Sequence, residues 1–209
     1  YIAGGEYFIN FADSSPKGQP RAGVIYQYGQ QINDHTLIDF GAFQLSKMKY
    51  GEEPEITTLG PVLANLFFLD GWEKYAGNEP LIGEYYFPDL QVAIARDKEG
   101  SSDGFFMAAK GGHNDEQHNH NDVGSCIIFY NGQPVIADVG VGTYTKQTFS
   151  DERYKIWTMQ SDYHNLPLIS GISQSPGRGF KAKDSKFVAG KSKVTFSTNI
   201  TDAYPQEAN

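Results

Sequence analysis

The stretch Ser125-Cys-Ile-Ile-Phe-Tyr-Asn-Gly-Gln-Pro-Val-Ile-Ala-Asp138 decides the fold of this chain. Two apolar runs flank the dipeptide Asn131-Gly132. This dipeptide is a strong hairpin signal, because both residues tolerate the positive φ angles of a type I′ turn. We therefore expect antiparallel strands at 125–130 and 134–139. A turn at this point places Asp138 opposite Ser125, at the end of its strand.

Strand-like patterns continue over most of the chain after residue 89. Apolar runs bounded by turn residues predict further strands at 90–96, 104–109, 165–169 and 193–200. Two polar segments, 113–122 and 142–152, are expected to be loops. This part of the chain should be a mostly antiparallel β-domain, of the sandwich type.

Before residue 85 the pattern is helical. Asp34 is a candidate N-cap for an apolar stripe over 37–45. A second stripe runs over 59–67, with Pro61 suited to its first turn, and a weaker third at 24–32 consists of Val24, Ile25, Tyr28 and Ile32. The fold class is therefore α+β, with a helical part at 1–85 and a β-domain at 86–209.

Composition excludes several classes of protein. The 209 residues are 39% hydrophobic, which is enough to form a core, and carry a formal net charge of -8, which argues against a nucleic-acid binder. The single cysteine, Cys126, rules out an intrachain disulfide and is expected to pack in the core. No apolar stretch approaches the roughly 20 residues of a transmembrane helix.

Histidines form the most informative cluster, since His113, His118 and His120 fall within eight residues that also contain carboxylates. Such a cluster points to metal binding or catalysis, although a solvated polar loop could hold it without any function. Residues two apart in an extended chain face the same side, so His118 and His120 should be neighbours.

Asp138 and His164 are the candidate partners of His120. A straight strand would leave His120 and Asp138 about 16 Å apart, so they can share a metal only if residues 120–124 curl back, which Gly124 would allow. Two imidazoles and a carboxylate suit zinc with an open fourth position. Alternatively, Asp138 could bind backbone N–H groups and His164 could be an ordinary loop residue.

Three segments together resemble the heparinase II/III family of polysaccharide lyases. They are Gly111-Gly-His-Asn-Asp-Glu-Gln-His-Asn-His-Asn-Asp-Val-Gly-Ser125, Asn131-Gly-Gln-Pro-Val-Ile-Ala-Asp-Val-Gly-Val-Gly-Thr-Tyr144 and Thr158-Met-Gln-Ser-Asp-Tyr-His-Asn165. The similarity is strong over 105–170 and extends more loosely to 5–13 and 27–43.

The resemblance implies the last helices of an α/α toroid followed by an antiparallel β-sandwich that is incomplete at the C-terminus. It implies β-elimination of a uronic-acid-containing polysaccharide such as heparin or heparan sulfate, by a secreted or periplasmic bacterial lyase. By the same resemblance His118 is catalytic, and His120, Asp138 and His164 bind a divalent metal, commonly Zn²⁺. The toroid tyrosine that usually protonates the leaving group has no counterpart here, so this stretch alone should be inactive.

The sequence leaves several alternatives open for the substrate and the role of the domain. Another uronate polymer such as alginate could be the substrate, or the domain could be a non-catalytic, metal-stabilised glycan-binding module. His113 could contact substrate or be an ordinary loop histidine. The segment 178–193 carries a local charge of +5, which could attract an acidic glycan or simply protect a strand edge. The oligomeric state is open.

Overall fold

The computed structural model describes residues 1–18, 20–47 and 71–208. These form two compact units. The first contains Tyr1, 3–8 and the described part of 17–81, and the second contains Ile2, 9–16 and 82–208. The predicted apolar stripe at 59–67 lies outside the described residues. The division at 85 and 86 stays a prediction.

The first unit is a pair of helices, α1 (Ala22–Ile32) and α2 (His35–Lys47), followed by a short 3-10 turn at Trp72–Lys74. Asp34 is the N-cap of α2, as predicted, because its Oδ1 accepts a hydrogen bond of 3.1 Å from the Leu37 backbone N–H. The helix over 24–32 was predicted, but its expected face was wrong. Tyr26 is fully buried, whereas Val24, Tyr28 and Ile32 are exposed.

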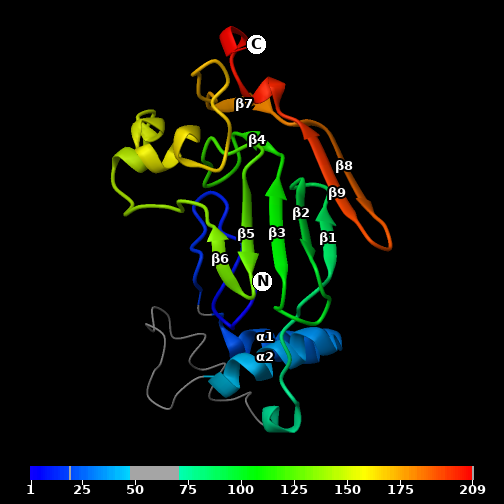
Figure 1. The fold of residues 1–209 in the computed structure, drawn as a ribbon. Coiled ribbons are helices and arrows are strands. Elements are labelled where there is room, and N and C mark those ends of the chain that lie inside the picture. The colour runs from blue at the N-terminus through cyan, green and yellow to red at the C-terminus, as the bar shows by residue number, and fades with distance from the viewer. Residues whose placement is uncertain (19, 48–70, 209) are drawn as a thin grey trace. The chain divides into compact units, whose positions relative to one another are not determined.

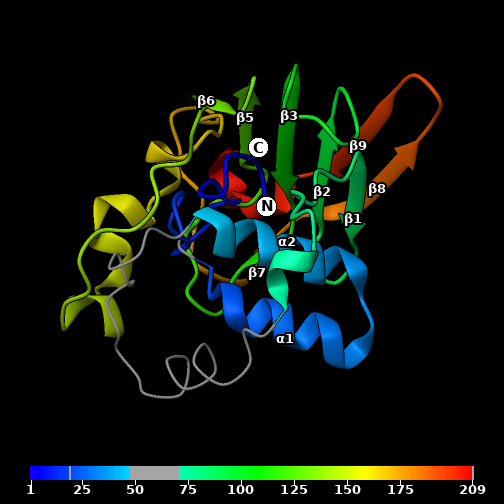
Figure 2. The same cartoon turned by 90° about the horizontal axis from the view of Figure 1, so that it is seen from below.

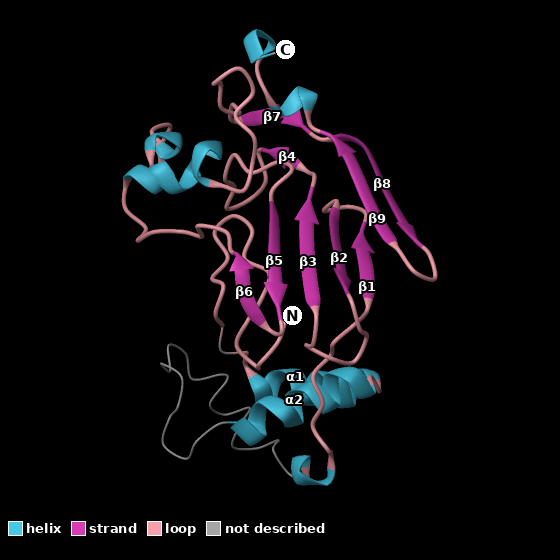
Figure 3. Ribbon diagram, in the orientation of Figure 1, coloured by secondary structure: helices cyan, strands magenta, loops and turns pink. Residues whose placement is uncertain are grey.

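The second unit is built on a five-stranded antiparallel sheet (Figures 1 and 3). Its strand order is β1-β2-β3-β5-β6. The strands are β1 (Glu84–Phe87), β2 (Val92–Arg96), β3 (Phe105–Lys110), β5 (Cys126–Tyr130) and β6 (Gln133–Ile136). Four of these match predicted strands to within two or three residues at either end, and β1 was not predicted.

Side chains alternate across this sheet as a half-covered sheet requires. Phe106, Ala108, Ile127 and Phe129 are buried on one face. Phe105, Met107 and Tyr130 are exposed on the opposite face, where Phe105 and Tyr130 are cross-strand partners. The buried face supplies the rigid platform from which the loop after β3 leaves.

Two smaller sheets complete the unit. One pairs β4 (His113–Asn114) with β7 (Gly177–Lys181), and the other pairs β8 (Lys183–Ala189) with β9 (Val194–Asn199). The β8–β9 hairpin lies beside β1 in both views (Figures 1 and 2), and the rings of Tyr86 and Phe187 stack there at 5.5 Å.

The strand predicted at 165–169 is wrong. Only Ile169 makes an isolated bridge, to Ile172. Pro167 has no N–H to donate to a ladder, and the chain before it runs through successive 3-10 turns ending at Tyr163. The predicted loop at 113–122 is irregular except for β4, and the one at 142–152 contains a 3-10 turn at Gln147–Phe149.

Candidate active site

The loop from Gly111 to Gly124 carries all three clustered histidines and is held at two points by one buried lysine. The Lys110 ammonium, at the end of β3, lies 2.7 Å from Asp122 Oδ1 and 3.4 Å from Glu116 Oε2. Gly124 has a φ of 91° and turns the chain back into β5, with the Ser125 N–H donating to the Asp122 carbonyl. The predicted curl of residues 120–124 is therefore present.

His118 lies at the exposed tip of this loop. Its side chain is 64% exposed, and its backbone has a φ of 58°, in the left-handed region that non-glycine residues rarely adopt. Its Nδ1 lies 3.2 Å from Asp13 Oδ2 and 2.9 Å from the Tyr144 hydroxyl oxygen. Within the described chain, Nε2 has no hydrogen-bond partner, so it is free to meet a ligand.

Asp13 joins the two neighbouring histidines. Its Oδ1 lies 2.7 Å from His120 Nε2, and Arg153 Nη2 donates to both carboxylate oxygens at 3.2 Å. The Tyr144 hydroxyl donates to Oδ2 as well. Burial alone would raise the pKa of Asp13, but the hydrogen bonds from Tyr144, His120 and Arg153, with the Arg153 charge, hold that pKa below its usual range.

The three predicted metal ligands, His120, Asp138 and His164, lie close to one another. The rings of His120 and His164 lie 5.1 Å apart, and His164 Nδ1 lies 2.8 Å from Asp138 Oδ2. All three side chains are buried. Burial, the largest influence, lowers the pKa of His120 below its usual value, although the hydrogen bond to Asp13 acts in the opposite direction. The lowered pKa favours the neutral ring that a metal requires.

Two unpaired atoms of this cluster are of the kind that binds a metal. His120 and His164 each point one ring nitrogen at a carboxylate, so each ring proton belongs there. The other nitrogens, Nδ1 of His120 and Nε2 of His164, are buried without a hydrogen-bond partner. Two such lone pairs are the donors that zinc takes from histidine, and Asp13 behind His120 is the usual kind of outer partner.

Asp138 fits the metal less simply. Its Oδ1 accepts the Gly140 N–H at 3.0 Å, and its Oδ2 faces His164. The carboxylate thus binds a backbone N–H, which was one of the two alternatives from the sequence, while its role as a metal ligand stays a prediction. Over the ranges that the structure describes, no group of three His, Cys, Asp or Glu side chains has the geometry to hold a metal ion.

His113 lies apart from this cluster, in a pocket of about 500 Å³. The pocket is lined from the β7 side by Arg178 and Lys181 and from the loop by Asp115, Glu116 and Gln117. Its charges are of both signs. Because Gln117 precedes His118, the pocket adjoins the loop tip, which keeps His113 a candidate for substrate contact.

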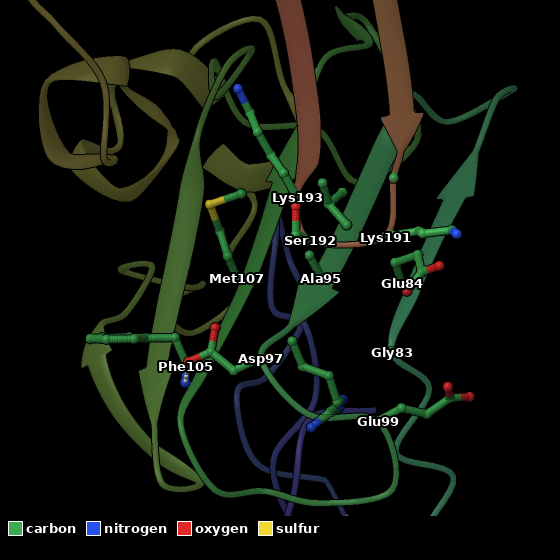
Figure 4. Close-up of a pocket in the computed structure, with 13 residues that line it drawn as sticks. Gly83, Glu84, Ala95, Asp97, Glu99, Phe105, Met107, Lys191, Ser192 and Lys193 are labelled. Carbon is green, nitrogen blue, oxygen red and sulfur yellow. Dashed lines mark hydrogen bonds between the residues drawn. The ribbon is translucent and has the colours of Figure 1, made fainter.

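A second pocket, of about 390 Å³, lies between the edge of the sheet and the β8–β9 turn (Figure 4). Glu84, Asp97 and Glu99 line it together with Lys191 and Lys193. It contains none of the histidines. Cys126, expected in the core, is half-buried, and burial raises the pKa of its thiol.

Asp13 and Arg153 were missed by reasoning from the sequence. They lie 105 residues before and 35 residues after His118, and no spacing pattern connects them. Only the looser resemblance over 5–13 touched Asp13. Tyr144 also belongs to the site, since its hydroxyl contacts Asp13 and His118.

Comparison with known proteins shows a similar fold in solved structures. The chain is similar in structure to the heparan sulfate lyase HepC from Pedobacter heparinus, with a TM-score of 0.64 and 14% identity over 96% of this chain and 26% of that one. A heparinase III structure gives a TM-score of 0.54 and 17% identity over 90% of this chain and 26% of the other. The chain thus spans about a quarter of the length of these structures.

No curated protein sequence matches the chain significantly. No helix in the described ranges is long and apolar enough to cross a membrane. The family model for the heparinase II/III-like C-terminal domain matches residues 86–208, which is more than half of the chain. This chain therefore belongs to the heparinase II/III-like C-terminal family.

Proposed function

We propose that this chain is the part of a polysaccharide lyase that supplies His118 as a catalytic base or carboxylate-neutralising group. The observation that carries the proposal is the state of the His118 ring. Its Nδ1 is held by Asp13 and Tyr144, while Nε2 on an exposed loop tip has no partner among the described residues. A histidine held in this way by one nitrogen presents the other to a substrate.

β-Elimination from a uronate explains why an imidazole is useful there. The C5 proton is only weakly acidic while the adjacent carboxylate is charged, so that charge must be neutralised before a base removes the proton. The bond between C4 and the glycosidic oxygen then breaks, and the leaving oxygen needs a proton. Nε2 of His118 can accept the C5 proton, or when protonated can donate to the carboxylate.

The rest of the machinery comes from outside this chain in our proposal. We take 1–85 as the last helices of an α/α toroid and 86–209 as part of an antiparallel β-sandwich. The toroid would supply the tyrosine that protonates the leaving oxygen. The protein would act in the periplasm or outside a bacterial cell, where polymeric glycans are met.

We also propose one divalent metal, Zn²⁺ by the nature of the donors, held by His120, His164 and Asp138. The unpaired nitrogens of both histidines support it. Iron and manganese also accept two imidazoles and a carboxylate. The metal would fix the loop that presents His118. Elemental analysis should find about one zinc per chain, lost in Asp138→Ala, and metal-free protein would refute this part.

Heparan sulfate or a related glycosaminoglycan is the proposed substrate class, because similar structures include heparan sulfate lyases. Arg178 and Lys181 beside His113 give positive charges next to the loop, within a chain of net charge -8. A different uronate polymer such as alginate is the second candidate. Parallel assays on both polymers would distinguish them.

The test is His118→Ala in the full-length protein. Formation of unsaturated uronate, followed by its ultraviolet absorbance, should fall by about 10²- to 10⁴-fold, the usual contribution of a general acid or base. Unchanged product formation would refute the catalytic role. It would favour the non-catalytic glycan-binding module, for which only the metal site is needed.

A further inference from the structure

The atoms around His118 Nδ1 determine which ring nitrogen carries the proton. Tyr144 donates its hydroxyl proton to Asp13 Oδ2, so toward His118 the Tyr144 oxygen can only accept. Asp13 Oδ2 is an acceptor too. Both neighbours of Nδ1 are therefore acceptors, which places the proton on Nδ1 and the lone pair on Nε2.

We propose that Asp13 is the positioning residue that fixes the orientation and ring tautomer of His118. The proposal rests on the proposed function, since it needs His118 to react through Nε2. Asp13 itself is 6% exposed, and its oxygens are occupied by His118, His120, Tyr144 and Arg153. It acts through His118 and does not touch the substrate.

The segment around Asp13 is tied firmly enough for this role. The Ala12 N–H donates to the buried Asp122 carboxylate at 3.2 Å, and the Asn10 side chain donates to the Asp138 carbonyl at 3.3 Å. Arg153 also donates to the Asn119 carbonyl, next to His118, at 2.8 Å. Asp13 and the histidine loop thus share Arg153, and the residue before Asp13 is bound directly to Asp122 of the loop.

A purely structural role is the alternative to exclude. Asp13 contacts Arg153 and His120 as well, so its loss could lower activity by loosening the whole loop. The two roles differ in one respect. Once His118 is removed, a positioning residue has nothing to orient, so its loss has no further effect. A residue that stabilises the loop still matters in the His118→Ala protein.

The experiment is a double-mutant cycle in the full-length protein with Asp13→Asn and His118→Ala, assayed by kcat and KM on heparan sulfate. Asparagine keeps the size of the side chain and removes its charge. Asp13→Asn alone should lower kcat about 10²-fold with KM changed less than about threefold, because the wrong tautomer fails only in the reaction step. In the His118→Ala background it should cause no further loss.

Two additional variants control for folding and for charge. Asp97→Asn, whose carboxylate accepts the Phe105 N–H elsewhere in the same unit, should leave kcat unchanged. Tyr144→Phe keeps Asp13 but removes the hydroxyl that faces Nδ1, and should lower kcat about tenfold, again only when His118 is present. This variant carries the test if Asp13→Asn proves unfolded by circular dichroism.

The outcomes are separable. Full activity of His118→Ala would overturn the proposed function and this inference with it. An inactive His118→Ala beside a fully active Asp13→Asn would overturn only the inference. A loss of kcat from Asp13→Asn that is equally large without His118 would assign Asp13 a structural role and also overturn it.

Discussion

Replacing Lys110 by methionine should destabilise the second unit severely and loosen the histidine loop. The Lys110 side chain is 3% exposed, and its ammonium lies 2.7 Å from Asp122, which is fully buried, and 3.4 Å from Glu116. Methionine fills a similar volume but leaves the Asp122 charge uncompensated. Breaking a buried pair in this way costs about 3–5 kcal/mol.

A loss of that size is readily measured. It corresponds to a fall in Tm of about 6–20 °C, at about 2–4 °C per kcal/mol for a domain of this length. Urea denaturation followed by circular dichroism gives the free energy of unfolding directly. The double variant with Asp122→Asn should regain much of the stability, because the unpaired charge is then gone.

Lys98→Met is the matched control. Lys98 lies 3.8 Å from Asp103, and both side chains are largely exposed. Such surface pairs contribute less than about 1 kcal/mol. If Lys110→Met cost no more than Lys98→Met, the buried charges would not be holding the loop, and our reasoning about its rigidity would be wrong.

The pH dependence of the same pair has a definite sign. Burial lowers the pKa of Lys110, but the charges of Asp122 and Glu116 outweigh it and raise that pKa above its usual value of 10.5. The stabilisation is therefore complete below pH 10.5 and disappears as pH rises through the pKa of the folded protein. The stability gap between wild type and Lys110→Met should be constant near neutral pH and close in strong alkali.

Two smaller effects follow from local geometry. Asp34→Ala removes the hydrogen bond to the Leu37 N–H and should cost about 0.5–2 kcal/mol, measured by urea denaturation, with Asp39→Ala on the same helix expected to change little. Gly124→Ala should cost about 1–3 kcal/mol, because φ is 91° and the new Cβ would lie 3.0 Å from Ile200 Cγ2. Gly142→Ala, where no atom lies within 4 Å, should be nearly neutral by thermal melting.

Features set by local chemistry could be predicted from the sequence. Asn131 and Gly132 have φ angles of 48° and 72°, which is what a type I′ hairpin requires of this dipeptide. The hairpin register is only approximately as expected, since a bulge near Ile128 shifts it by one residue. Ser125 still lies 3.4 Å from the Asp138 carboxylate.

Features set by distant parts of the chain could not be predicted. The contact between Asp13 and His118 joins residues 105 positions apart, and no local pattern encodes such a pair. The buried face of α1 was mispredicted for a related reason. Gly29 and Gly41 allow a close approach of the two helices along the face that carries Ala22, Tyr26 and Gly29, so Val24 and Tyr28 on the other side stay exposed.

His118 shows how stability and reactivity are linked in this loop. A left-handed backbone at a non-glycine residue costs on the order of 1–3 kcal/mol and persists only where the surroundings enforce it. Here Lys110 binds Glu116 two residues before the histidine and Asp122 four residues after it, while Asp13 holds the ring. Because the same buried charges stabilise the unit and impose this conformation, a variant that weakens them should lose both stability and correct presentation of Nε2. Replacing His118 by glycine would relieve the backbone strain, but it would also remove the imidazole ring that Asp13 orients.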